Sequence, residues 1–302
     1  MIVDVQYNSI KWYHILNPTE SDYEYLSTHF NFHPLVIDDC RSKTQRPKVD
    51  TYDDYYFLIL HFPFFDKTEK FIITKEIKIF WAKDFLITVG NSHKIVNDLF
   101  ISAKEDQKIL EDLLSGGTDF LLYKILENTS QKTVTLLEKL GTHIENISLD
   151  LFNKKAVQTI EKISFTRKNI ILLDTIFKPQ LRLFRNFESG EIKGFTEDME
   201  EYWGNILDYY QKTWDMIEDY EEMTEGYSKT FDSLQANKTN EIMRVLTFIS
   251  TTLLPLTFIT GLYGMNIGLP FQNHPYSFWI VVGFMLAIVI AFLIFFKRKK
   301  LM

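Results

Sequence analysis

The stretch "GLYGMNIGLPFQNHP", residues 261–275, joins two apolar runs and contains two prolines but no acidic or basic residue. Before it, residues 242–262 are apolar except for Arg244, one proline and scattered Ser and Thr, and after it residues 278–296 carry no charge. A membrane-spanning helix needs about 20 apolar residues to cross the hydrocarbon core. Each run is long enough, so the sequence predicts two membrane-spanning helices joined by a short loop.

The basic residues at the end of the chain predict the topology. Four consecutive basic residues, 297–300, follow the second apolar run, whereas the loop 263–277 has no Lys or Arg. Positively charged segments stay on the cytoplasmic side. We therefore expect both termini in the cytoplasm and the loop outside. No basic region followed by an apolar run opens the chain, so no cleavable signal peptide is expected. The predicted location is the inner (plasma) membrane, with multiple passes.

Composition argues against several function classes. The 302 residues carry 33 Lys and Arg against 40 Asp and Glu, a formal net charge of −7, so no nucleic-acid partner is expected. The lone Cys40 forbids an internal disulfide. We find no Gly-rich phosphate loop, no His-Glu-x-x-His and no cysteine pair. The chain is therefore predicted not to be an enzyme and to need no cofactor.

The pattern along the chain changes after about residue 115. Runs rich in β-formers at 55–65, 72–81 and 84–90 predict an α/β domain, and later residues show long helical periodicity. The predicted segments are 1–115, cytoplasmic α/β domain; 116–195, long antiparallel helices; 196–262, stalk helix continuing into the first span; 263–277, external loop; 278–296, second span; and 297–302, basic cytoplasmic tail.

The stalk helix is predicted to start near Thr196, because a Thr followed by an acidic first turn is a typical N-cap. The next proline is Pro255, so no residue forces a break before the membrane. The stalk is acidic and the helix before it is basic. This contrast indicates either two helices paired by charge or a surface that concentrates cations.

One face of the first span carries a narrow, mildly polar stripe. Its residues recur three or four positions apart: Asn240, Met243, Leu246, Ser250, Leu254, Thr257 and Gly261. Two helices cannot enclose a pore, so a pore would need several copies with the long helix innermost and the second span toward lipid. The alternative is structural, because Ser and Thr often bond back to the helix and Gly often marks helix packing.

The loop after the stripe offers neutral oxygen acceptors. The carbonyls at the end of a helix near Gly261–Gly264 lack helical partners, and Asn266 adds an amide oxygen. Such acceptors suit Mg²⁺, which prefers oxygen and usually keeps several of its waters. The same residues also fit a simple turn. Neither span contains a carboxylate or His, so a proton relay within the membrane is not expected.

The segment "KTNEIMRVLTFISTTLLPLTFITGLYGMN", 238–266, resembles the CorA family of divalent-cation channels, whose signature is Tyr-Gly-Met-Asn after the first of two C-terminal spans. The segment "HPLVIDDCRSKTQRPKVDTYDDYYFLIL", 33–60, resembles that family's cytoplasmic domain, and the likeness covers essentially the whole chain. The resemblance implies a funnel-shaped homopentamer with an α/β cytoplasmic domain, long stalk helices and two C-terminal transmembrane helices.

The resemblance also implies roles for individual residues. Gly264, Met265 and Asn266 would form the selectivity filter. The pore lining would be Asn240, Met243, Leu246, Leu254, Thr257 and Gly261, with Met243, Leu246 and Leu254 as a hydrophobic constriction. The implied activity is passive uptake of hydrated Mg²⁺, with Co²⁺ or Ni²⁺ as further ions, closed by cytoplasmic Mg²⁺. A regulatory Mg²⁺ would bind between subunits at Asp39 and either Asn205 or Asp208.

Two alternatives stay open. The loop lacks the Glu that many relatives carry after Gly-Met-Asn and is nearer in character to the ZntB branch, with His274 before a proline, although Met265 favours the Mg²⁺ side. This leaves a ZntB-like, proton-coupled zinc transporter as one alternative. The other is a membrane-anchored helical scaffold or sensor, whose two spans only tether the stalk.

Overall fold

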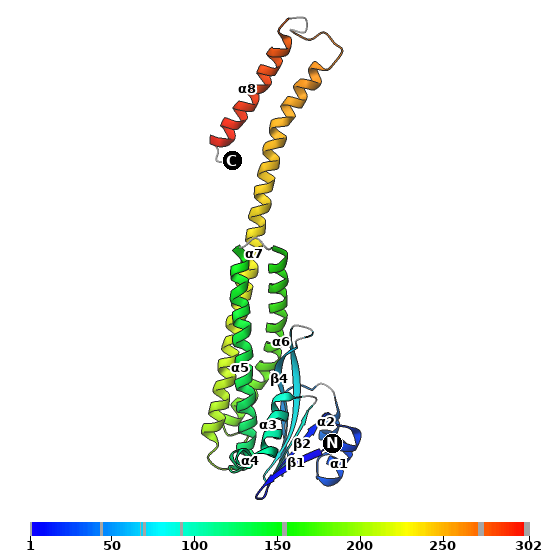
Figure 1. Ribbon diagram of the computed structural model, residues 1–302, viewed down its shortest axis with the longest axis vertical. Helices are drawn as coiled ribbons and strands as arrows, with labels where there is room; N and C mark the ends of the chain where they lie inside the picture. The colour runs from blue at the N-terminus through cyan, green and yellow to red at the C-terminus, as the bar shows by residue number, and fades with distance from the viewer. Residues whose placement is uncertain are drawn as a thin grey trace. The chain divides into compact units, whose positions relative to one another are not determined.

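The computed structural model describes residues 2–42, 45–66, 68, 71–90, 93–152, 156–270 and 275–298 (Figure 1). The chain divides into two compact units, Met1–Ser228 and Lys229–Met302, which are described separately.

The first unit is built on one sheet. Its described strands are β1 (Ile2–Tyr7), β2 (Ile10–Leu16), β3 (Lys48–Thr51), β4 (Tyr55–Asp66), β5 (Phe71–Ala82) and β6 (Phe85–Gly90). They follow the order β1-β2-β6-β5-β4-β3, with β2 and β6 parallel and the other neighbours antiparallel. The three predicted strands correspond to β4, β5 and β6. The edge strands β1 and β3 are mostly half-buried, so their apolar pattern is weak.

Eight helices are described around and beyond the sheet. They are α1 (Glu20–His29), α2 (Pro34–Arg41), α3 (Lys94–Glu105), α4 (Gln107–Leu114), α5 (Gly117–Phe152), α6 (Ala156–Glu188), α7 (Glu200–Tyr263) and α8 (Ser277–Arg298). The three long helices predicted after the α/β domain are α5, α6 and α7. The predicted fold class, an α/β domain followed by long helices and two apolar C-terminal segments, is confirmed.

Alternation along β4 gives the sheet two buried faces. Phe57 and Ile59 pack in one cluster with residues of α1 and α2, and Leu58 and Leu60 pack in the other with α3 to α7. Successive side chains of a strand point to opposite faces, so a strand buried on both sides reads as a continuous apolar run. Figure 1 shows α1 and α2 on the side of the sheet away from α5.

Helix α7 begins at Glu200 rather than at an N-cap on Thr196. The buried carboxylate of Asp119 accepts hydrogen bonds from the backbone N–H groups of Phe195 (2.8 Å) and Thr196 (2.6 Å) and from Trp81 Nε1 (2.8 Å). Asp198 then adopts a φ of 66°, outside the right-handed helical region. A tertiary contact therefore holds Thr196 in a non-helical segment, against its local capping signal.

Two amide side chains of α6 complete the hydrogen bonding of strand edges. Gln180 accepts from the N–H of His61 and donates to its carbonyl, both at 2.9 Å, where β4 extends beyond its partner β3. Asn169 accepts from the N–H of Ile72 at 2.9 Å, where β5 has no partner on its β6 side. Both amides are buried, so α6 covers backbone groups that would otherwise lack partners.

Two buried histidines predict acid sensitivity of the first unit. Desolvation lowers the pKa of His14 and of His93 to about 4, and both side chains are nearly inaccessible. Unfolded histidine titrates near 6.5, so below that pH the unfolded chain binds protons that the folded chain does not bind until about pH 4. Stability should fall by about 2 kcal/mol per histidine between pH 7 and pH 5.

The measurement for this prediction is the urea midpoint of tryptophan fluorescence at pH 7 and pH 5. His14→Gln with His93→Asn should flatten the decrease, because the amides keep hydrogen-bonding capacity without titrating. A midpoint that rises toward pH 5 in the unsubstituted protein would contradict the assignment.

In the second unit, α8 packs along the C-terminal part of α7 (Figure 1). Phe248 and Phe296 meet edge to face with ring centroids 5.2 Å apart. Both helices are long and apolar enough to span a membrane. Pro255 lies inside α7 without ending it, and the Thr252 hydroxyl donates to the Phe248 carbonyl at 2.8 Å one turn before it.

Candidate pore and metal-ion site

Most of the predicted pore residues lie on the side of α7 that faces away from α8, whereas Asn240 and Met243 line a pocket with Phe296 near the end of α8. Between residues 240 and 263, the half-buried side chains of α7 are Phe248, Thr251, Thr252, Pro255, Leu256 and Ile259. All the predicted pore residues are exposed: Asn240, Met243, Leu246, Leu254, Thr257 and Gly261. Because each helical residue turns by about 100°, the two sets occupy opposite faces. The face carrying the stripe is therefore left without a partner in a single chain.

The three residues predicted to form a constriction are strongly exposed. Met243 is 53% exposed, Leu246 54% and Leu254 72%. In one chain the Thr257 hydroxyl donates to the Leu253 carbonyl at 2.9 Å, which is the common back-bonding geometry of Thr in membrane helices. That bond uses the hydroxyl hydrogen and leaves acceptor capacity on its oxygen. The stripe therefore presents apolar side chains and neutral oxygens.

The Gly-Met-Asn motif forms a turn at the end of α7. The N–H of Gly264 donates to the Thr260 carbonyl at 2.9 Å, and that of Met265 to the Leu262 carbonyl at 3.2 Å. A Cβ on Gly264 would lie 3.1 Å from the Thr260 carbonyl oxygen, so a side chain there would require the turn to shift by a few tenths of an ångström. Asn266 is exposed just beyond the turn. His274, which precedes a proline in the loop and was compared with the ZntB branch, lies outside the described residues.

Only neutral groups are available to a cation along this face. The last acidic residue of the chain is Glu241, so neither span nor the loop carries a carboxylate. Neutral carbonyl and amide oxygens do not replace the water shell of a small divalent cation as readily as carboxylates do. The chemistry of this face therefore suits an ion that keeps its waters.

Asp39, predicted to hold a regulatory ion, lies on α2, which is capped by His33 and begins with Pro34. Its carboxylate forms an ion pair with Lys48 Nζ at 2.7 Å and accepts from Gln45 Nε2 at 3.3 Å. Desolvation opposes the charge on Lys48, but hydrogen bonds to Asp39 and Asp50 raise its pKa. In one chain Asp39 is thus neutralised by a lysine, with which a metal ion would compete.

The position of α2 depends on a buried lysine, Lys78, whose role was not predicted from the sequence. Lys78, which is 6% exposed, donates to the carbonyls of Cys40 (2.8 Å) and Ser42 (2.6 Å) and pairs with Glu76 at 2.9 Å. A cation at the C-terminus of a helix satisfies carbonyls that have no helical partner. The only sequence signal is that Lys78 interrupts the apolar residues between Ile77 and Ala82 in β5.

Asn205 and Asp208 lie on α7, and one chain does not bring them to Asp39. Asn205 Nδ2 donates to the Tyr123 hydroxyl at 2.8 Å, and Asp208 is exposed. Among the described residues, no group of three or more His, Cys, Asp or Glu side chains is placed to hold a metal ion. The predicted regulatory site therefore stays a prediction about contacts between copies.

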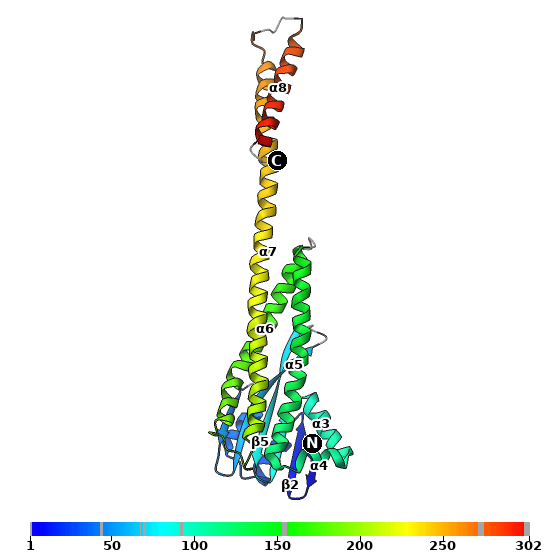
Figure 2. The same ribbon diagram turned by 90° about the vertical axis from the view of Figure 1, so that its left-hand side faces the viewer.

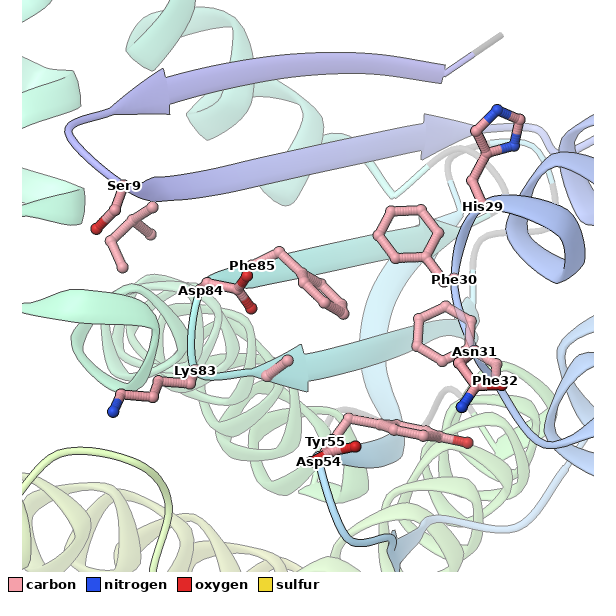
Figure 3. A pocket seen from close by; sticks show the side chains of 12 residues that line it. Ser9, His29, Phe30, Asn31, Phe32, Asp54, Tyr55, Lys83, Asp84 and Phe85 are labelled. Carbon is pink, nitrogen blue, oxygen red and sulfur yellow. The ribbon is translucent and has the colours of Figure 1, made fainter.

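A groove of about 680 Å³ lies beside the segment that leads into α2 (Figure 3). Among the residues that line it, Phe30 packs against Phe85 with ring centroids 5.0 Å apart, and Phe32 stacks on Phe80 at 4.2 Å. These rings pack with one another and hold in place the segment that leads to His33, the N-cap of α2. The aromatic side chains around the groove thus support α2. The described lining residues include no cluster of metal ligands.

Comparison with known proteins agrees with this arrangement. Residues 7–298 match the family described as CorA-like Mg2+ transporter protein. YfjQ of Bacillus subtilis, named as a metal ion transporter, is 29% identical, covering 98% of this chain and 91% of its own. The cobalt/magnesium transport protein CorA of Thermotoga maritima is 25% identical, covering 90% of this chain and 77% of its own.

A solved structure extends the likeness to the whole fold. The CorA magnesium transporter of Methanocaldococcus jannaschii matches with a TM-score of 0.83 and 23% identity, covering 97% of this chain and 92% of its own. Members of the family are inner-membrane channels or transporters with two C-terminal helices, not enzymes. With a family match over nearly its whole length, the chain belongs to the CorA-like Mg²⁺ transporter family.

Proposed function

We propose that this protein is a homopentameric channel for passive uptake of hydrated Mg²⁺ across the plasma membrane, with Co²⁺ or Ni²⁺ as further permeant ions. The main observation that supports this proposal is the exposed, neutral stripe on α7, which faces away from α8 and ends at the Gly-Met-Asn turn. Five such stripes around an axis would enclose a pore, with α8 toward lipid. Two relatives are named for cobalt and magnesium transport, which supports these ions.

The motif residues take different roles in this proposal. Gly264, Met265 and Asn266 select the hydrated ion at the outer mouth, because carbonyl and amide oxygens hydrogen-bond to its waters. Met243, Leu246 and Leu254 form a constriction that closes by losing water. Both termini are cytoplasmic in this arrangement, since the basic residues after α8 stay inside.

The pore assignment predicts that a bulky side chain on the stripe blocks flux. Thr257→Leu and Gly261→Leu should each reduce Mg²⁺ entry into liposomes by about an order of magnitude, because added apolar bulk narrows and dries the pore. Gly283→Leu in α8 is the matched control, since a Cβ meets nothing within 4 Å at either Gly261 or Gly283. Unchanged flux in both stripe variants would favour the tethered scaffold.

Regulation is proposed at Asp39 together with Asn205 or Asp208 of a neighbouring copy, where a bound Mg²⁺ would favour the closed state. Asp39→Ala should raise uptake at high internal Mg²⁺ about fivefold, the lower end of a typical allosteric coupling. The adjacent Asp38→Ala is the control, because Asp38 pairs with Arg41 at 3.5 Å on the exposed side of α2. Equal regulation in Asp39→Ala and the unsubstituted protein would exclude Asp39 from gating.

Proton-coupled zinc transport is the second candidate, favoured by the absence of acidic residues from the loop and by similarity to the zinc transport protein ZntB of Yersinia pseudotuberculosis (23% identity). The spans carry no carboxylate or His to relay a proton. Liposome flux separates the two: Mg²⁺ entry indifferent to a proton gradient supports the channel, and proton-stimulated Zn²⁺ entry supports the transporter.

A further inference from the structure

A groove of about 1120 Å³ opens in the first unit between α5, α6 and the end of the sheet formed by β4 and β5. In both views α5 and α6 continue past this end of the sheet (Figures 1 and 2). We propose that it binds an anionic amphiphile, namely a single acyl chain that ends in a carboxylate. The inference is independent of the pore.

The floor of the groove is apolar. Leu136 and Leu140 of α5 lie one helical turn apart, Phe165 comes from α6, and Phe64 and Ile72 come from β4 and β5. Leu140 is 7% and Ile72 2% exposed, and the other three side chains are half-buried. Ligand pockets usually combine such a floor with a few polar groups in about 300–1,000 Å³, and this groove lies slightly above the upper end of that range. The floor and the volume together suit a hydrocarbon chain.

The rim of the groove is basic. Lys132 and Lys139 of α5 are exposed, and no ion pair is found for either among the described residues. Lys162 of α6 also lines the groove and pairs with Asp150, while Glu161 is the one acidic side chain among the described lining residues. The two unpaired lysines are seven residues apart, so they lie on one side of α5 along about 10 Å.

His143 adds a polar atom without a partner. His143 lines the groove, and its Nε2 is buried and makes no hydrogen bond within the described part of the chain. Desolvation and then the charge of Lys162 lower the pKa of His143, while the carboxylate of Asp150 acts in the opposite direction. A carboxylate beside it would supply an acceptor for a ring N–H and a counter-charge for the lysines.

A ligand that has both an apolar chain and an anionic group matches both the apolar floor and the basic rim of the groove. A purely ionic ligand such as inorganic phosphate would leave the Leu136, Leu140 and Phe165 surface in water. A neutral hydrocarbon would leave Lys132 and Lys139 without a counter-charge. A carboxylate head near the lysines with its chain along the floor meets both demands.

The test is photolabelling of the full-length protein in nanodiscs with a 16-carbon fatty acid that carries a diazirine at the chain end, followed by peptide mapping. Labelling should fall on α5 and α6 peptides that line the groove. The double variant Lys132→Glu/Lys139→Glu and the filling variant Leu136→Trp should each reduce it about tenfold, equivalent to about 1.4 kcal/mol. The double variant Lys104→Glu/Lys108→Glu, an equal charge change at exposed sites on α3 and α4 outside the groove, should not.

Three outcomes would overturn the proposal. Labelling confined to α7 and α8 would mean that the probe only partitions into the bilayer. Equal labelling by the matching 16-carbon alcohol would remove the role of the carboxylate. Groove labelling by a diazirine phosphatidylglycerol but not by the fatty acid would assign the groove to a two-chain membrane lipid.

Discussion

Asn266→Ala is expected to reduce Mg²⁺ flux about a hundredfold, the largest effect of any single substitution considered. Asn266 follows the tight turn that ends α7, where its amide is exposed, and no carboxylate in the loop substitutes for it. In the proposed pentamer, the change removes several hydrogen bonds to the water shell of one ion, each of about 1 kcal/mol. The measurement is Mg²⁺ entry into liposomes, read with an internal dye.

Substitutions at two glycines of the same loop test whether the effect of Asn266→Ala is specific to the Gly-Met-Asn turn or follows from any change in the loop. Gly264→Ala should also lose flux, because its Cβ would lie 3.1 Å from the Thr260 carbonyl oxygen. Gly268→Ala should keep flux, because a Cβ there meets nothing within 4 Å. Normal flux in Asn266→Ala would contradict the proposed filter. If Thr257→Leu nevertheless blocked flux, the proposal that α7 lines a pore would still hold.

Asp119→Ala is expected to lower the stability of the first unit by about 4 kcal/mol, since removal of a buried acceptor leaves its donors unsatisfied. The donors are Trp81 Nε1 and the backbone N–H groups of Phe195 and Thr196. Burial raises the pKa of Asp119, and the two backbone donors act against that rise. Melting followed by tryptophan fluorescence should shift down by about 10 °C.

Asp112→Ala is the control for Asp119→Ala, because Asp112 is an exposed aspartate on neighbouring α4. Asp119→Asn should have an intermediate effect, since the amide keeps one acceptor oxygen but turns an N–H₂ toward a donor. An unchanged melting temperature for Asp119→Ala would show that the hydrogen bonds to Phe195 and Thr196 do not anchor the start of α7.

Much of the architecture follows from local sequence pattern. Runs rich in β-forming residues predict β4, β5 and β6, and strands buried on both faces need no strict alternation. Helical periodicity predicts α5, α6 and α7, and the length of uncharged sequence predicts the spans. The stripe from Asn240 to Gly261 can also be predicted from the sequence, because residues three or four positions apart share a helical face independently of the tertiary structure.

Other features could be found only in three dimensions. The start of α7 departs from the Thr196 capping signal because Asp119, far away in sequence, holds the backbone there. The pairing of Asp39 with Lys48, and the anchoring of α2 by Lys78, depend on which strands lie beside that helix. The same holds for the groove beside His143, built from two helices and two strands.

By itself the sequence determined the central strands β4, β5 and β6, the long helices and the spans, and which residues share the exposed face of α7, because these depend on short-range periodicity and hydrophobicity. Only the tertiary structure decided that this face is the one turned away from α8, that a lysine neutralises Asp39, and where α7 begins. Each of these depends on contacts between residues distant along the chain, and a single sequence carries no local signal for such contacts.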